Sequence, residues 1–169
     1  MNTKTESELQ KDVQYFEYTK AANPLAQGSI SQVPFAELLS HLHEQGATRI
    51  IPFDLADKLS CGGPASSPNL SAAFIRIEPG EQICTSANAT SELYYVIRGK
   101  GVTTRNELSM EWKAGDFFVL PCGSELIHSA ETDSALYWIT DEPLLRYLGV
   151  SATEKRFSPT LYKAEDCES

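Results

Sequence analysis

The stretch SAAFIRIEPGEQICTSANATSELYYVIRGKG, residues 71–101, decides the fold of this chain. It holds two runs rich in apolar and β-branched residues, SAAFIRIE and ELYYVIR, which end at the turns Pro79-Gly80 and Gly99-Lys100-Gly101. Two similar runs, DFFVL and ALYWIT, follow and are also bounded by turn residues. Short strands with turns at close intervals are typical of an antiparallel sandwich or barrel. The sequence therefore predicts an all-β domain.

The region before these strands has a helical pattern instead. In PFAELLSHLHEQG, residues 34–46, apolar residues recur at the i, i+3, i+4 and i+7 positions of an amphipathic helix. Proline near the start and glycine at the end are common at helix boundaries. We therefore expect three parts: an N-terminal extension, residues 1–47, with one helix at about 34–45; a barrel, residues 48–150; and a C-terminal tail, residues 151–169.

The charge balance narrows the classes of partner. The 169 residues include 14 Lys and Arg against 23 Asp and Glu, which gives a net charge of −9. Nucleic acids and anionic membrane surfaces need a basic footprint, so we expect neither as a partner. No apolar segment has the length of a secretion signal or a membrane span, which favours a cytoplasmic protein. The four cysteines form no C-x-x-C pair and are expected to be free thiols.

Six residues at turns and strand edges follow a recognisable spacing: Gly80, Glu92, Gly99, Gly115, Pro121 and Gly123. They occupy the fixed positions of the two motifs of the cupin superfamily, G(X)5HXH(X)3–4E(X)6G and G(X)5PXG(X)2H(X)3N. The chain thus resembles the cupins, which are small jelly-roll β-barrels that usually hold a divalent metal. The resemblance implies a single cupin barrel with an N-terminal extension.

A narrower resemblance rests on PASSPNLSAAFIRIEPGE, TSANATSELYYVIRGKG, GDFFVLP and YWITDEPLLRYLGV. These segments are similar to the N-terminal cupin of gentisate 1,2-dioxygenase-like bicupins, over most of residues 13–165. In such proteins the iron-binding His-x-His lies in one cupin half, while the other half can lack ligands. The resemblance implies a homodimer, and a catalytic cupin that is either missing or carried on a separate chain.

The chain departs from both motifs at the metal ligands. Ser86 and Asn88 replace the two histidines of the first motif, and Leu126 replaces the histidine of the second. Iron or manganese in such a site normally needs imidazole ligands, and only the carboxylate of Glu92 is left. We therefore predict a degenerate site without a cofactor; if a metal were bound, it would be iron or manganese.

The sequence has three histidines from which a replacement ligand can come. His128 lies two residues after Leu126, so on a strand both side chains face the same way. We favour a buried, hydrogen-bonded His128 over a metal ligand or an acid–base group. His41 and His43 project about 200° apart on the expected helix and cannot chelate one ion from it.

Further candidates follow from the same alternation. Tyr94 shares a strand face with Glu92, and Tyr137 on another strand is expected to add a second polar tip to the cavity. Glu92 is either a general acid or base in an apolar barrel or a remnant that hydrogen-bonds Asn88, Ser86 or a backbone amide. The pocket candidates are Ser86, Asn88, Glu92, Tyr94, His128 and Tyr137; no catalytic residue is assigned.

Three functions remain open at this stage. The first is a metal-free cupin that binds a small molecule or partners a catalytic cupin, and we favour it because all three motif histidines are missing. The second is a metal-dependent dioxygenase-type cupin whose site is rebuilt from Glu92 and His128. The third is a metal-free isomerase, lyase or dehydratase with Glu92 or His128 as acid or base. Whether the chain is an enzyme is left undecided.

Overall fold

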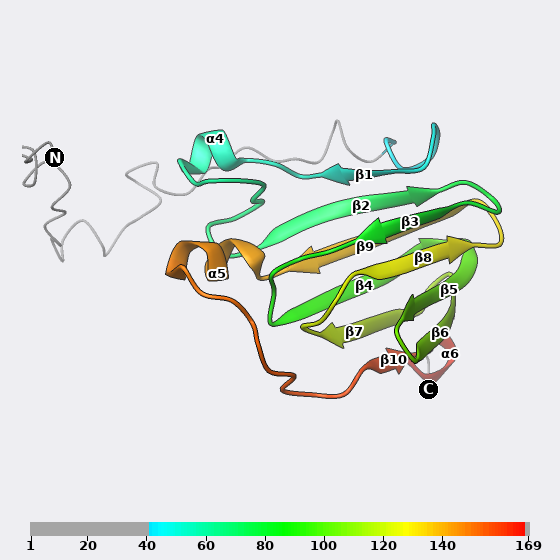
Figure 1. Cartoon of the computed structure of the whole chain (residues 1–169). Coiled ribbons are helices and arrows are strands. Elements are labelled where there is room, and N and C mark those ends of the chain that lie inside the picture. Colours follow the sequence, from blue (N-terminus) through cyan, green and yellow to red (C-terminus); the bar gives the residue numbers. More distant parts are fainter. Residues whose placement is uncertain (1–40, 168–169) are drawn as a thin grey trace, which may run out of the picture. The chain divides into compact units, whose positions relative to one another are not determined.

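A computed structural model describes residues 41–167, and this part contains ten strands and three short helices (Figure 1). The strands are β1 (Arg49–Pro52), β2 (Ser71–Ile77), β3 (Gln82–Thr85), β4 (Ser91–Arg98), β5 (Lys100–Arg105), β6 (Leu108–Lys113), β7 (Phe117–Pro121), β8 (Leu126–Ala130), β9 (Ser134–Thr140) and β10 (Thr160–Tyr162). The helices are α4 (Ala56–Leu59), α5 (Glu142–Leu148) and α6 (Ala164–Cys167).

The strands form two antiparallel sheets that face each other (Figure 1). The larger sheet has the order β1-β2-β9-β4-β7-β10, and the smaller has the order β3-β8-β5-β6. Non-consecutive strands are neighbours in both sheets, so the chain crosses between the layers repeatedly, as in a jelly roll. The predicted all-β jelly-roll barrel is confirmed.

The core lies between the two sheets and follows from the alternation of buried and outward side chains along strands such as β4 and β8. Tyr94 and Val96 on β4 are fully buried, and so are Leu126 and His128 on β8. Their neighbours in sequence turn outward; Tyr95, for example, is 43% exposed. Burial of one face per strand fixes the register, because a slip of one residue would move every core side chain into water.

The C-terminal tail contributes a strand to the larger sheet, which the sequence analysis does not predict. Residues 160–162 form β10, which pairs with β7 and extends the larger sheet. Leu161 packs against the core, and the Asp116 carboxylate accepts hydrogen bonds from Lys163 Nζ at 3.1 Å and from the Ala164 N–H at 3.0 Å. The expected helix at about 34–45 falls largely outside the described residues, which begin in a turn at 41–44.

One motif glycine has a plain structural reason. Gly99 joins β4 to β5 with a φ of +88°, a backbone conformation that residues other than glycine rarely adopt. A Cβ atom there would also lie 2.1 Å from Ser134 Oγ and 2.6 Å from the carbonyl oxygen of Asp133. Only glycine fits this turn.

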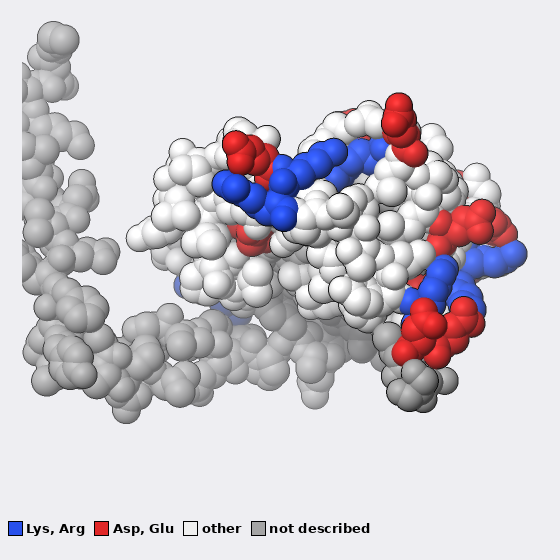
Figure 2. Space-filling view, turned by 90° about the horizontal axis from the view of Figure 1, so that it is seen from below, with Lys and Arg blue, Asp and Glu red and all other residues white. Residues whose placement is uncertain are grey.

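The charged side chains on the surface are of both signs. On the face drawn in Figure 2, basic side chains lie beside acidic ones, and wide areas carry neither. That face therefore presents no extended basic surface for a nucleic acid. Within residues 41–167, every helix is too short or too polar to cross a membrane.

Candidate functional site

The centre of the barrel contains a buried ion pair. The Arg105 guanidinium on β5 donates from Nη2 to Glu92 Oε1 on β4 over 2.6 Å, and only 6% and 2% of the two side chains are exposed. Arg105 Nη1 also donates to the carbonyl oxygen of Pro121 at 2.7 Å. Gly123 makes room for this arrangement, because a Cβ atom there would lie 2.9 Å from Arg105 Nη1. The carboxylate of the first motif thus has a cationic partner inside the protein.

Hydrogen bonds continue from Glu92 across the interior. The Tyr94 hydroxyl donates to Glu92 Oε2 at 2.8 Å. Thr85 Oγ1 lies 2.9 Å from the Tyr94 hydroxyl and 2.9 Å from His128 Nε2. On the other side of the imidazole, Thr103 Oγ1 lies 2.8 Å from His128 Nδ1. Both ring nitrogens of His128 are therefore engaged.

The direction of the hydrogen bonds follows from the Glu92 end of this chain. The Tyr94 hydroxyl has one proton and donates it to Glu92, so Thr85 donates to Tyr94 and accepts from the His128 Nε2–H. The other nitrogen of the uncharged ring, Nδ1, then accepts from the Thr103 hydroxyl, which itself accepts from Trp112 Nε1 at 2.9 Å. We call this set, Trp112–Thr103–His128–Thr85–Tyr94–Glu92–Arg105, the interior chain.

Burial fixes the protonation states along the interior chain. Burial, and to a lesser extent the positive charge of Arg105, lowers the pKa of His128 to about 3. Burial, together with the Glu92 carboxylate, raises the pKa of Tyr94 well above its usual value. At neutral pH His128 is therefore an uncharged imidazole and Tyr94 a protonated phenol, as the hydrogen-bond directions require.

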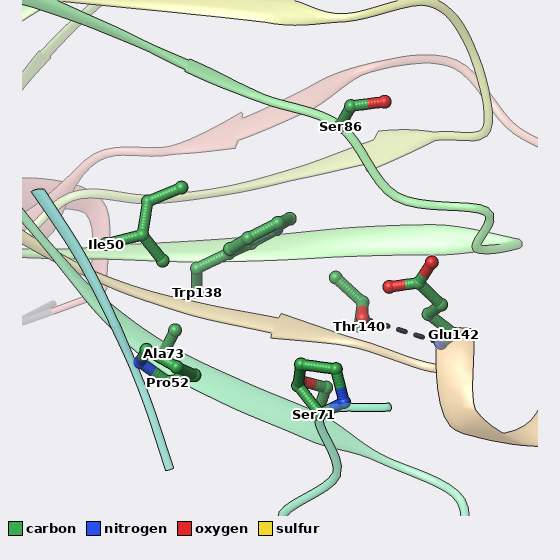
Figure 3. Close-up of a pocket in the computed structure, with 9 residues that line it drawn as sticks. Ile50, Pro52, Ser71, Ala73, Ser86, Trp138, Thr140 and Glu142 are labelled. Atoms are coloured by element: carbon green, nitrogen blue, oxygen red, sulfur yellow. Dashed lines mark hydrogen bonds between the residues drawn. The ribbon is translucent and has the colours of Figure 1, made fainter. Parts of the chain in front are cut away.

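A separate cavity of about 400 Å³ opens at one end of the barrel (Figure 3). Figure 3 shows the Trp138 ring reaching between Ile50 and Ser86, with the Glu142 carboxylate across the same space. We call it the mouth cavity. Its lining residues are Ile50, Pro52, Pro64, Ser71, Ala73, Ser86, Trp138, Thr140 and Glu142.

The apolar wall of the mouth cavity is the end of an aromatic row. Trp138 stacks on Tyr94 with ring centroids 6.0 Å apart and planes 10° apart, and Tyr94 stacks on Phe118 at 4.9 Å and 14°. The cross-strand neighbour of Trp138 on its other side is Ala73. A methyl group takes the place of a fourth large side chain there, and the cavity opens at that point.

Comparison with known proteins finds a family match within this barrel. Residues 73–140 match the family described as "Cupin domain". The barrel has a cupin fold. The chain is 34% identical over 93 residues to a 5-aminosalicylate 1,2-dioxygenase of Comamonas sp. The aligned segment covers 54% of this chain and 25% of that protein. It is 34% identical over 90 residues to gentisate 1,2 dioxygenase 1 of Aquipseudomonas alcaligenes, with coverages of 52% and 25%.

A solved structure shares the fold. The salicylate 1,2-dioxygenase of Pseudaminobacter salicylatoxidans superposes with a TM-score of 0.50 at 22% identity, over 70% of this chain and 32% of that one. The predicted resemblance to gentisate dioxygenase-like cupins is thus confirmed. The match spans about a quarter of the length of the curated relatives.

The residues of this cupin domain do not fit the metal that the superfamily usually holds. Each nitrogen of His128 has a threonine partner, and each oxygen of Glu92 has a donor. To bind a metal, His128 would have to give up one of these buried hydrogen bonds, because each of its ring nitrogens has a single site for a proton or a partner. Within residues 41–167, no group of three or more His, Cys, Asp or Glu side chains is arranged to hold an ion.

The structure places the six predicted pocket residues in four different surroundings. Glu92, Tyr94 and His128 meet in the interior chain, on the shared faces that alternation predicts. Ser86 is exposed and lines the mouth cavity instead. Asn88 is also exposed and ties down the tail, donating to the Val150 carbonyl at 2.9 Å and accepting from the Ala152 N–H at 3.1 Å. Glu92 hydrogen-bonds neither Ser86 nor Asn88; its partners are Arg105 and Tyr94.

Tyr137 points away from the barrel interior. Its ring packs on the outer face of the larger sheet, against Phe53 at 5.7 Å and Phe74 at 5.8 Å between centroids. The next residue, Trp138, is the one that faces inward. Both faces of this strand are apolar, so the sequence alone does not tell which of the two aromatic residues lines the cavity.

Sequence reasoning missed Thr85, Thr103, Arg105 and Trp112 of the interior chain, and most of the lining of the mouth cavity, including Trp138. Thr103 and Arg105 have a detectable signal, since they alternate on KGVTTR and therefore share one face of a strand. Thr85 lies one residue before Ser86, the first histidine position of the motif, and nothing in the sequence marks its hydroxyl as part of a site.

The described cysteines offer no activated nucleophile. Cys61, Cys84 and Cys122 are free, as the sequence predicts. Desolvation and the neighbouring Glu125 carboxylate raise the pKa of the exposed Cys84 thiol, which is the opposite of activation. Cys122 is buried.

Proposed function

We propose that this cupin domain is a metal-free module that binds a small molecule in the mouth cavity. It works alone or beside a catalytic cupin on another chain. The interior chain carries this proposal: both ring nitrogens of His128 and both carboxylate oxygens of Glu92 already have hydrogen-bond partners. A buried network of this kind rigidifies a core and engages the atoms that would otherwise bind a metal.

A rebuilt metal site is the less favoured alternative. It would need Glu92 and His128 on one ion, but Tyr94 and Thr85 lie between them in the interior chain. The protonated Nε2 of His128 donates to Thr85, so this nitrogen has no lone pair to offer a cation. Coordination through Nε2 would require the other tautomer and the loss of the hydrogen bond to Thr85, and coordination through Nδ1 would require the loss of the hydrogen bond from Thr103.

Acid–base catalysis by Glu92 or His128 is also less favoured. A general base must reach the proton that it removes. Both side chains are buried, and neither lines the mouth cavity. With a pKa of about 3, His128 is also far from the value at which imidazole exchanges protons efficiently near neutral pH.

Partnership with a catalytic cupin chain rests on a different observation. The predicted apolar run LLRYLGV forms α5 and the turn after it, and Tyr147 is 84% exposed, Leu148 57% and Val150 51%. Exposed apolar clusters of this kind mark interaction surfaces. The identity of that partner, a homodimer and the cytoplasmic location remain predictions.

Oxygen consumption by the purified chain tests the proposal. The chain would be loaded anaerobically with Fe(II) and then given gentisate, salicylate or 5-aminosalicylate in aerated buffer. We expect oxygen uptake no faster than with Fe(II) and substrate alone. Turnover above this background that disappears in both Glu92→Gln and His128→Ala would contradict the proposal and favour the rebuilt metal site.

A further inference from the structure

We infer that the mouth cavity selects small organic cations, such as amines with an apolar body. This inference rests on the proposed function, since it names the class of ligand for the same cavity. It follows from an open aromatic face, one lining carboxylate and the lack of an opposing positive charge in the cavity wall.

The aromatic face belongs to Trp138. Tyr94 covers one side of its ring, and β9 lies between β4 and β2, so the opposite side turns toward Ala73. The mouth cavity opens on that side, beside Ile50 and Pro52. Cations are attracted to the face of an aromatic ring, and tryptophan is the strongest of the aromatic side chains in this respect. A cation in the cavity would therefore lie against the indole.

The charge of the cavity wall comes from one described side chain. Among residues 41–167 that line the cavity, Glu142 is the only ionisable one. Its ion pair with Arg146, one turn along α5, is long at 3.6 Å and partly exposed, with 31% and 35% of the side chains accessible. Its other oxygen, Oε1, accepts from the Asn88 N–H over 3.4 Å. Both contacts are long, and a carboxylate can accept several hydrogen bonds, so it can still bind a ligand. Figure 3 shows this carboxylate directed into the space beside Trp138.

An anionic ligand finds no comparable partner in the same wall. The start of α5 has few free N–H groups: Pro143 has none, the Glu142 N–H donates to Thr140 Oγ1 at 3.4 Å, and the Leu144 N–H donates to the Asp141 carbonyl at 3.0 Å. The hydroxyls of Ser71, Ser86 and Thr140 suit a neutral polar group as well as a charged one. The one charged side chain among the described lining residues is the acidic Glu142.

The size of the cavity fits a small molecule. Ligand pockets in proteins typically enclose about 300–1,000 Å³. The mouth cavity, at about 400 Å³, lies near the lower end of this range. An amine with a handful of carbon atoms can enter such a space.

Three probes of nearly equal shape separate charge from size. The first is choline. The second is its carbon isostere, in which a tert-butyl group replaces the trimethylammonium group, and the third is the anion of tert-butylacetic acid. Each is titrated into the full chain, and binding is followed through the indole N–H signal of Trp138 by NMR. The protein has two tryptophans, so Trp138→Phe assigns the signal.

We expect choline to shift the Trp138 signal and to bind at least about tenfold more tightly than its carbon isostere, the scale of a desolvated cation–π contact. Glu142→Gln is expected to weaken choline binding about three- to tenfold and to leave the isostere unaffected. Glu154→Gln is the matched control, because Glu154 is exposed and lies in the tail. Ala73→Leu should abolish binding of both by filling the cavity.

The other outcomes overturn the inference in distinguishable ways. Equal or tighter binding of the neutral or the anionic probe, blocked by Ala73→Leu, would refute cation selection and support a small-molecule cavity. No shift of Trp138 with any of the three probes would refute cation selection and also remove the support for ligand binding at this site.

Discussion

Arg105→Met is expected to lower the free energy of unfolding by about 3–5 kcal/mol, the usual cost of removing one partner from a buried ion pair. Methionine keeps most of the length of the side chain but removes the charge. Glu92 would then be a buried carboxylate with only the Tyr94 hydroxyl as a donor. Urea denaturation followed by circular dichroism measures the change.

A double variant separates charge from packing. In Glu92→Gln/Arg105→Met neither residue is charged, and the amide oxygen can still accept from Tyr94. We expect the double variant to be more stable than Arg105→Met alone and to regain at least half of the loss. If Arg105→Met unfolds at the same urea concentration as the unchanged protein, the ion pair does not hold the interior chain together.

Acid is expected to destabilise the protein through His128 in a defined pH window. An unfolded histidine titrates near 6.5, while the folded His128 stays neutral down to about pH 3. Between these values the unfolded state binds the extra proton, so the stability present above pH 6.5 is lost as the pH falls toward 3. The shift corresponds to a loss of up to about 5 kcal/mol from this residue.

His128→Gln isolates this effect, because the glutamine side chain does not titrate between pH 6.5 and 3. The stability of this variant should depend less steeply on pH between 6.5 and 3, by up to about 1.4 kcal/mol per pH unit. His41→Gln is the control, since 79% of the His41 side chain is exposed. Identical pH slopes in His128→Gln and the unchanged protein would show that His128 is not held neutral by burial.

Local periodicity predicts part of the interior correctly. Glu92, Tyr94 and Val96 share one face, and Leu126 shares a face with His128, because side chains alternate along a strand regardless of its partners. The turn glycines of the cupin motifs are equally local. Such features require no knowledge of which strand lies opposite.

The partners of those residues depend on tertiary register and are not predictable in the same way. Arg105 reaches Glu92 from the other sheet, across the barrel. Strand β3 ends at Thr85, so the motif positions of Ser86 and Asn88 lie beyond the strand. The side chain that points into the barrel at this end of β3 is therefore that of Thr85. Trp138 and Tyr137 were indistinguishable because Phe53 and Phe74 make the outer face of that strand apolar too.

The metal content of the tag-free chain tests the central claim most directly. It is measured by mass spectrometry as purified, and again after anaerobic loading with Fe(II) or Mn(II) and removal of unbound ions. We predict far less than one ion per chain in every case, with no difference between the unchanged protein, Glu92→Gln and His128→Ala. One tightly held ion per chain that both variants lose would contradict the account, because it would make Glu92 and His128 ligands instead of members of a closed interior chain.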